Sequence, residues 1–246
     1  MTEPCVFNYR AYPRRINLGC GLDKRPDYLN VDLNDFHAPD LVGDVCDLPV
    51  LPSGYYEHIL ARDILEHLPR ARCLRALREW NRLLARGGTL ELQVPNVVGL
   101  LTLLTREDRQ NFRAQEELLQ CLFGTQAYRG DYHYNGFTEI TLRQYLADAG
   151  FDLLVLNTRE EWLFEAVAVK SAEVEHEAFY GAAGDADFLR AAYRALLGRE
   201  PDAGGLAFYL ERLRAGMLRE EVVQALKNSP EYRDPATAGQ RKFAAG

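Results

Sequence analysis

Short apolar runs alternate with longer amphipathic stretches between residues 15 and 169. Seven of the apolar runs have the length of buried strands: 15–18, 28–33, 41–45, 58–61, 89–94, 151–156 and 163–169. Strands that alternate with helices favour an α/β fold built on a doubly wound, mostly parallel sheet. A short polar link joins the last two runs, so we expect that pair to be antiparallel.

Two stretches between these runs carry helical patterns. Apolar residues recur at intervals of three and four at Leu74, Leu77, Trp80, Leu83 and Leu84. They predict one helix that begins near Pro69 and ends at Gly87-Gly88. Thr141 and Gln144 have capping-box spacing and predict a second helix that stops at Gly150. Residues 97–123 are first apolar and then amphipathic, which indicates a lid or core helix, with contact to a membrane surface as the less favoured reading.

The pattern changes after residue 169. Residues 170–184 are rich in Glu, Ala and Gly and are typical of a linker, whereas only helical stripes follow in residues 185–246. The three stripes are Leu189, Ala192, Tyr193 and Leu196; Leu206, Tyr209, Leu210 and Leu213; and Val222, Val223 and Leu226. Asp202 follows a turn and is the expected N-cap of the second helix. We therefore predict an α/β domain over 1–169, a linker over 170–184 and a small all-α domain over 185–246.

Composition and charge narrow the class of protein. The chain has 246 residues, 47% of them hydrophobic, and a formal net charge of −7, which disfavours nucleic acid as a partner. Five cysteines are scattered without Cys-x-x-Cys spacing, so neither a zinc site nor a disulfide framework is expected. Reduced thiols fit a cytoplasmic location. The first 15 residues lack the apolar core of a signal peptide, and the apolar stretch 92–105 is too short to span a bilayer.

A glycine turn follows the first predicted strand, in the sequence Gly19-Cys20-Gly21. Glycines at the carboxyl end of a strand allow a ligand to approach the backbone closely. Dinucleotide binding would need a third glycine where this chain has Lys24, and the ending of a P-loop is missing. The turn is therefore not built for a pyrophosphate.

Acidic residues end the next two strands. Asp32 closes the second strand, where a carboxylate can accept hydrogen bonds from both ribose hydroxyls of an adenosyl ligand. Only ten residues separate it from Gly21, so the helix expected between them is shortened or lost. Asp44, or as second choice Asp47, follows the third strand and could accept from an adenine amino group, while the next backbone N–H donates to a ring nitrogen.

These motifs together resemble class I S-adenosylmethionine-dependent methyltransferases, in particular a short bacterial subgroup associated with glycan biosynthesis. The resemblance rests on the segments INLGCG, YLNVDL, GDVCDLP, ILARDILEHL, LLARGGTLELQVPN and FTEITLRQYLADAGF and covers about residues 14–169. It implies a Rossmann-like sheet of seven strands with an antiparallel last strand, and S-adenosyl-L-methionine as cofactor. It implies contacts to the methionine part at Gly19 and Gly21, to ribose at Asp32, and to adenine near Asp44 and Val45. The neighbouring cofactor positions are Asn17, Leu18, Cys20, Leu33, Arg62 and Asp63.

Methyl transfer to a hydroxyl group benefits from a base that takes the proton, and histidine titrates in the required range. His67 lies just beyond the fourth strand, and His133 lies in the polar, aromatic segment 130–137. Either one is the candidate base, with Asp63 or Asp131 orienting it. Tyr132 and Tyr134 offer rings for a sugar face or simply pack. Asp63 and Asp131 could also hold a divalent ion, but two carboxylates are too few to assign one, so no metal ligand is predicted.

The predicted function is methyl transfer to a hydroxyl of a saccharide or polysaccharide-related acceptor. A natural product or a quinone-like molecule is an alternative acceptor, and a non-catalytic scaffold is an alternative function. Residues 188–233 resemble a bacterial domain of unknown function that is similar to phycobilisome-linker repeats. That resemblance implies no chemistry, and it favours a helical module that binds a protein partner or the acceptor.

Overall fold

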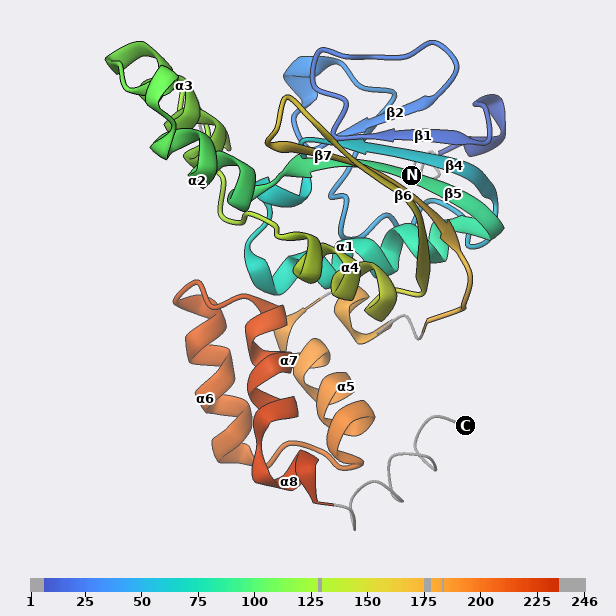
Figure 1. Ribbon diagram of the computed structural model, residues 1–246. Helices are drawn as coiled ribbons and strands as arrows, with labels where there is room; N and C mark the ends of the chain where they lie inside the picture. Colours follow the sequence, from blue (N-terminus) through green and yellow to red (C-terminus); the bar gives the residue numbers. More distant parts are fainter. Residues whose placement is uncertain (1–6, 128–129, 175–177, 183, 235–246) are drawn as a thin grey trace. The chain divides into compact units, whose positions relative to one another are not determined.

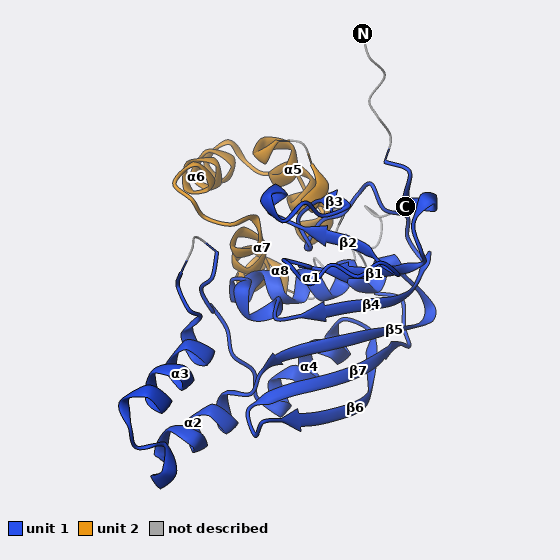
Figure 2. Ribbon diagram, turned by 90° about the horizontal axis from the view of Figure 1, so that it is seen from above, with its two compact units in different colours: residues 1–176 blue, residues 177–246 orange. Residues whose placement is uncertain are grey.

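A computed structural model describes residues 7–127, 130–174, 178–182 and 184–234. The chain divides into two compact units, residues 1–176 and 177–246, which are coloured separately in Figure 2. The division falls inside the stretch predicted as a linker. Each unit is described by itself below.

A seven-stranded sheet forms the centre of the first unit (Figure 1). Its strands are β1 (Arg15–Leu18), β2 (Leu29–Asp32), β3 (Leu41–Val42), β4 (Tyr56–Arg62), β5 (Leu84–Pro95), β6 (Phe151–Arg159) and β7 (Leu163–Lys170). Their order in the sheet is β3-β2-β1-β4-β5-β7-β6, and β7 runs antiparallel to both of its neighbours while the other pairs are parallel. The predicted mostly parallel Rossmann-like sheet with an antiparallel last strand is confirmed.

The order of the strands reverses at β1. Ile16 pairs with Leu29 of β2 on one side and with Ile59 of β4 on the other. All three side chains are fully buried, which is why these runs are continuously apolar. The carboxyl ends of β1, β2 and β4 therefore meet at one edge of the sheet, at the point where ligands bind in open α/β folds.

The helices α1 (Arg70–Leu83) and α4 (Glu139–Asp148) contact one another and lie beside the sheet (Figure 1). Trp80 of α1 is completely buried, and its indole N–H donates to the carbonyl of Val45 at 3.0 Å. The stretch 97–123 folds into α2 (Val97–Thr105) and α3 (Phe112–Phe123), joined by the 3₁₀ turn η4 (Glu107–Arg109). Among the described residues, no helix combines the length and the apolarity needed to cross a membrane.

The predicted end of the first helix was wrong. The helix stops at Leu83, and Leu84 already belongs to β5. Leu84 pairs with Tyr56 and Thr89 pairs with His58, so residues 85–88 bulge out of the strand. Gly87, with a φ of 76°, takes the left-handed conformation within this bulge. The glycine pair thus marks an irregular strand instead of a helix terminus.

The predicted start of α4 was also wrong. The N-cap is Thr138, whose hydroxyl accepts the Thr141 N–H at 3.2 Å, while the Thr141 hydroxyl accepts the Thr138 N–H at 2.9 Å. The capping box therefore lies three residues earlier than the spacing of Thr141 and Gln144 indicated. A threonine replaces the usual Glu or Gln at the reciprocal position, which is why the sequence pattern was missed.

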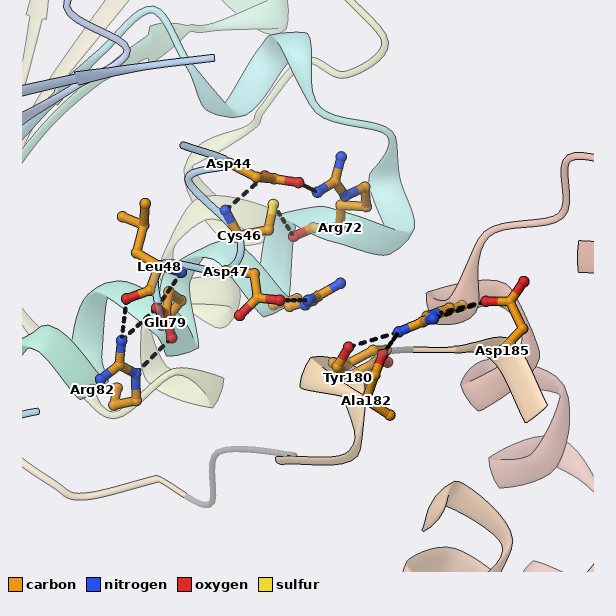
Figure 3. A network of polar contacts seen from close by, with 12 residues as sticks. Asp44, Cys46, Asp47, Leu48, Arg72, Glu79, Arg82, Tyr180, Ala182 and Asp185 are labelled. Atoms are coloured by element: carbon orange, nitrogen blue, oxygen red, sulfur yellow. Dashed lines mark hydrogen bonds and ion pairs between the residues drawn. The ribbon is translucent and has the colours of Figure 1, made fainter. Parts of the chain in front are cut away.

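The second unit is helical and has its own core. Its described residues form η5 (Ala178–Gly181), α5 (Asp185–Leu197), α6 (Ala203–Arg214), α7 (Arg219–Asn228) and α8 (Pro230–Arg233), and of these the short α8 was not predicted. The predicted stripes of α5 and α7 are buried, and the Asp202 carboxylate caps α6 by accepting the Gly205 N–H at 2.8 Å. Arg219 donates to the carbonyls of Tyr180 and Ala182 and to the Asp185 carboxylate, which fixes the start of this unit (Figure 3).

Charged side chains of α1 hold the loop that follows β3. Glu79 is fully buried and accepts the Leu48 N–H at 2.8 Å (Figure 3). Arg82 donates to both carboxylate oxygens of Glu79 and to the carbonyls of Leu48 and Leu51. The buried Glu79 carboxylate needs Arg82 as its partner, because an unpaired charge in the protein interior lowers the free energy of unfolding.

We therefore expect Arg82→Ala to lower the free energy of unfolding of the first unit by about 3 kcal/mol or more. The matched control is Arg113→Ala, because Arg113 forms an exposed i,i+4 pair with Glu117. That pair should contribute less than about 1 kcal/mol. Urea unfolding followed by tryptophan fluorescence measures both, since Trp80 and Trp162 lie in the first unit. Equal losses in the two variants would contradict the prediction.

Candidate functional site

The glycine turn lies at the carboxyl end of β1, as predicted. Gly19 and Gly21 have φ values of 59° and 48°, in the left-handed region that favours glycine. A Cβ at Gly19 would overlap the Ile64 side chain, whereas a Cβ at Gly21 would meet no atom within 4 Å. The turn is therefore closed on the side of β4 and open at Gly21. Leu18 is buried beneath it, and the carboxamide of Asn17 donates to the Asp23 carbonyl at 2.8 Å, which closes the loop from below.

Asp32 joins the ends of β1 and β2. Its carboxylate accepts the Gly21 N–H and the Asn34 N–H, each at 2.8 Å, and faces Nδ1 of His37 at 3.2 Å. Each oxygen keeps lone pairs for further donors, because a carboxylate offers about four acceptor positions. Burial, together with the nearby Asp32 charge, raises the pKa of the Cys20 thiol to about 11. Cys20 is therefore a protonated, structural thiol at neutral pH.

The residues after β3 are held by α1. One Asp44 oxygen accepts the Cys46 N–H at 2.9 Å, and the other forms an ion pair with Arg72 (Figure 3). Asp47 pairs with Arg75 at 3.2 Å. Val45 is buried, and its carbonyl accepts the Trp80 indole N–H. Leu33, which follows Asp32, is 67% exposed and presents an unpartnered apolar side chain at this edge.

The end of β4 contributes Arg62 and Asp63. Arg62 forms an ion pair with Glu91 of β5, and this hydrogen bond raises the pKa of its guanidinium. Asp63 has a φ of 53°, which is unusual for a residue with a side chain and concentrates at functional sites. The strained residue turns the chain from β4 into the 3₁₀ turn η3 (Leu65–His67).

His67 of η3 and His133 of the segment 130–137, the two alternative candidates for the base, lie side by side. Their ring centroids are 4.7 Å apart, at an interplanar angle of 84°. Nδ1 of His67 lies 3.2 Å from the Tyr132 carbonyl, and Nδ1 of His133 lies 3.0 Å from the Cys121 carbonyl. A carbonyl only accepts, so Nδ1 of each ring donates its N–H, and Nε2 is the nitrogen left for other partners.

The orienting partners differ from the prediction. Backbone carbonyls, and not Asp63 or Asp131, receive the Nδ1 protons of the two rings. Asp131 instead accepts a hydrogen bond from the Thr125 hydroxyl. Burial, followed by the proximity of His67, lowers the pKa of His133 below its usual value, so this ring is neutral at pH 7. Main-chain carbonyls leave no trace in a sequence motif, and they could not have been predicted.

Two residues that the sequence reasoning missed hold the segment 130–137 against η3. The Glu66 carbonyl accepts the Tyr134 and Asn135 N–H groups, at 2.7 and 3.2 Å. The Asn135 side chain donates to the Leu68 carbonyl and accepts from Arg70. The Glu66 side chain is 1% exposed, and burial, followed by the Asp63 charge, raises its pKa well above the usual value. In the sequence, the acidic side chain directly before His67 was the feature that could have pointed to Glu66.

A cavity of about 340 Å³ lies between the α2–α3 pair and the β6–β7 turn. Its charged and aromatic lining consists of Arg109, Glu117, Glu160, Glu161 and Trp162, and Cys121 links it to His133 through the carbonyl described above. Glu160 and Glu161 have φ values of 52° and 68°, which a tight hairpin turn requires and which is costly for glutamate. The strained turn thus belongs to the wall of the cavity.

The chain matches the family described as "Methyltransferase domain" over residues 14–156, more than half of its length, and it belongs to that family. The match confirms the predicted class, a class I methyltransferase, and with it S-adenosylmethionine as cofactor. Residues 168–236 match "Domain of unknown function (DUF4214)". No curated protein matches the sequence.

Solved structures are similar to this chain at low sequence identity, with TM-scores below 0.5. A possible exported protein from Bordetella parapertussis is 16% identical with a TM-score of 0.46; the match covers 65% of this chain and 63% of that one, less than two thirds of its length. A SAM-dependent methyltransferase from Methanosarcina mazei is 15% identical with a TM-score of 0.48, over 65% of this chain and 92% of that chain. The 1,6-didemethyltoxoflavin-N1-methyltransferase of Burkholderia thailandensis, solved with S-adenosylhomocysteine, is 13% identical with a TM-score of 0.43. The match covers 68% of this chain and 75% of that chain.

The buried Glu66 predicts an unusual pH dependence of stability. A carboxyl whose pKa is raised in the folded protein stabilises it fully below the ordinary pKa of 4.5, and this contribution is lost as the pH rises toward the folded value. Glu66→Gln keeps the shape of the neutral carboxyl and cannot ionise. Its stability relative to the wild type should therefore increase with pH, by up to about 1.4 kcal/mol per unit.

Urea unfolding at pH 5, 6.5 and 8 in the presence of a chelator measures this difference. The control is Glu116→Gln on the exposed face of α3, which should follow the wild type at every pH. A constant difference between Glu66→Gln and the wild type would show that the Glu66 carboxyl ionises normally.

Proposed function

We propose that the first unit transfers the methyl group of S-adenosylmethionine to a hydroxyl of a saccharide or polysaccharide-related acceptor. The observation that carries this proposal is the pair of His67 and His133 beside the end of β4, both with Nδ1–H donated to the backbone. The neutral His133 offers an unprotonated Nε2 where a proton must leave a hydroxyl acceptor, and the His67 ring lies beside it.

The cofactor edge fits an adenosyl sulfonium. Gly21 leaves open space for the methionine part, and Asp32 offers free acceptor positions to the ribose hydroxyls. Leu33 and Phe36, 67% and 68% exposed, give an apolar surface that an adenine ring would cover. When bound, S-adenosylmethionine supplies an electrophilic methyl group with a neutral leaving group. Asn17, Leu18, Cys20, Asp44, Val45, Arg62 and Asp63 complete the proposed cofactor set.

The chain's own contribution to the reaction is alignment and proton removal. The strained Asp63 directs η3 toward the segment 130–137, and the carbonyls of Tyr132 and Cys121 hold the two rings in one tautomer. His133 is neutral because burial lowers its pKa, so its Nε2 is ready to accept a proton. His133 is our first choice for the base and His67 its neighbour, with Asp63 and Asp131 supplying nearby negative charge that favours the protonated ring.

The surroundings of the histidines suit a sugar. Tyr132 and Tyr134 are 41% and 59% exposed, and their rings can cover the apolar face of a pyranose. The adjoining cavity adds the Trp162 ring and the carboxylates of Glu117, Glu160 and Glu161. Carboxylates accept hydrogen bonds from hydroxyl groups. An aromatic wall combined with several acceptors matches a polyhydroxylated acceptor better than a flat apolar one.

Two further proposals concern the role of the second unit and the cellular location of the protein. We assign residues 185–246 to a module that binds a protein partner of glycan assembly or the acceptor itself. Its self-contained core, separate from the core of the sheet, supports this role. A cytoplasmic location is consistent with Cys20, Cys46, Cys73 and Cys121 being reduced thiols.

Cofactor binding is tested by calorimetry with S-adenosylmethionine. Asp32→Asn removes the charge that accepts from the ribose, and we expect it to weaken binding by about 10- to 100-fold. Asp148→Asn, on the exposed end of α4, is the matched control and should bind like the wild type. Absence of binding heat in the wild type would favour the scaffold alternative over an enzyme.

Transfer is tested with saccharides as acceptors and radiolabelled methyl donor. His133→Ala should lower kcat by about 100-fold or more, because a positioned base contributes at least that much, and His67→Ala should lower it less. Calorimetry verifies that both variants still bind the donor. Full turnover by the double variant would remove both histidines from the mechanism, and turnover confined to quinol or natural-product acceptors would reassign the substrate.

A further inference from the structure

Glu66, His67 and His133 form a cluster that the sequence did not reveal. One carboxylate oxygen and one nitrogen of each ring all lie within 4.8 Å of one another. The two histidines come from segments 66 residues apart in the chain, so the fold and not local sequence brings them together. From this cluster we propose a binding site for a divalent transition metal ion, held by the Glu66 carboxylate and by Nε2 of His67 and of His133.

The first argument is the state of the two rings. A metal-bound imidazole uses one nitrogen for the metal and almost always donates the N–H of the other to a carbonyl or a carboxylate. Both rings already have this arrangement, since Nδ1 of each donates to a backbone carbonyl. The tautomer and the direction of both rings are therefore set before an ion arrives.

The second argument is the Glu66 side chain. It is 1% exposed, and within the described part of the chain its Oε2 has no hydrogen-bond partner. Buried polar atoms are normally paired, so a buried carboxylate oxygen without a donor calls for an explanation. A cation bound between Glu66 and the two rings would supply the missing partner.

The donor set defines the class of ion. Two imidazole nitrogens and one carboxylate suit Zn²⁺ or Co²⁺, whereas Mg²⁺ and Ca²⁺ prefer oxygen ligands alone. Ligands about 2.1 Å from one ion lie about 3.4 Å apart, so the three groups must draw together by about an ångström. Three protein ligands leave a fourth position for water or an acceptor oxygen. An Nε2 that holds the ion cannot also accept a proton, so the metal-loaded form lacks the free base proposed above.

The experiment is a titration of the untagged, chelator-treated full chain with Co²⁺, followed by visible absorption and by calorimetry. We expect one equivalent to bind with the intense bands of a four-coordinate site, and Zn²⁺ but not Mg²⁺ to displace it. Glu66→Gln, His67→Gln and His133→Gln should each weaken binding by about 100-fold or more. The control His37→Gln removes an imidazole elsewhere in the same unit and should leave the spectrum unchanged.

No bound Co²⁺ in the wild type, or binding that the three variants leave unaffected, would overturn the proposal. If the buried Glu66→Gln variant fails to fold, the two partly exposed histidines decide the question. The two proposals can fail separately. If the protein binds S-adenosylmethionine but not Co²⁺, only the metal site is refuted. If it binds Co²⁺ but not S-adenosylmethionine, only the proposed methyl transfer is refuted.

Discussion

The parallel pairing of β1 with both β2 and β4 is the constraint on which the rest of the structure depends. Because the chain adds strands first on one side of β1 and then on the other, three strand ends open at a single edge. The hydrogen bond from the Gly21 N–H to Asp32 joins two of these ends. The third end, at Asp63, leads directly to η3 and the histidine pair. The glycine turn with Asp32 and the histidine pair therefore lie at the same edge because of the strand order.

Most of the fold could be predicted from the sequence, because buried parallel strands have continuous apolar runs and turn residues separate them. The errors occurred where local signals compete. Gly87-Gly88 is a typical helix end, but pairing of Leu84 with Tyr56 drew the chain into β5 earlier and made the glycines a bulge. Thr138 was overlooked as an N-cap because its partner Thr141 is an uncommon member of a capping box.

The candidate site was predictable to the extent that it depends on residue type and strand position. Gly19, Gly21 and Asp32 occupy the ends of predicted strands, so they could be placed before the structure was known. The contacts around His67 and His133 could not, because they run between segments far apart and mostly involve backbone carbonyls. The same holds for Glu66. The sequence shows that it is a carboxylic acid, but its complete burial results from the tertiary fold and could not be predicted.

The α2–α3 pair has a separate small apolar cluster of Leu100, Leu103 and Leu118, with Trp162 packed against it, and this cluster is distinct from the core of the sheet. Segments with few shared apolar contacts open at a lower free energy than the domain that carries them. The amides of these two helices should therefore exchange with solvent while the central strands stay protected. Because the pair walls the cavity beside the β6–β7 turn, local opening of the two helices widens this cavity while the sheet stays folded.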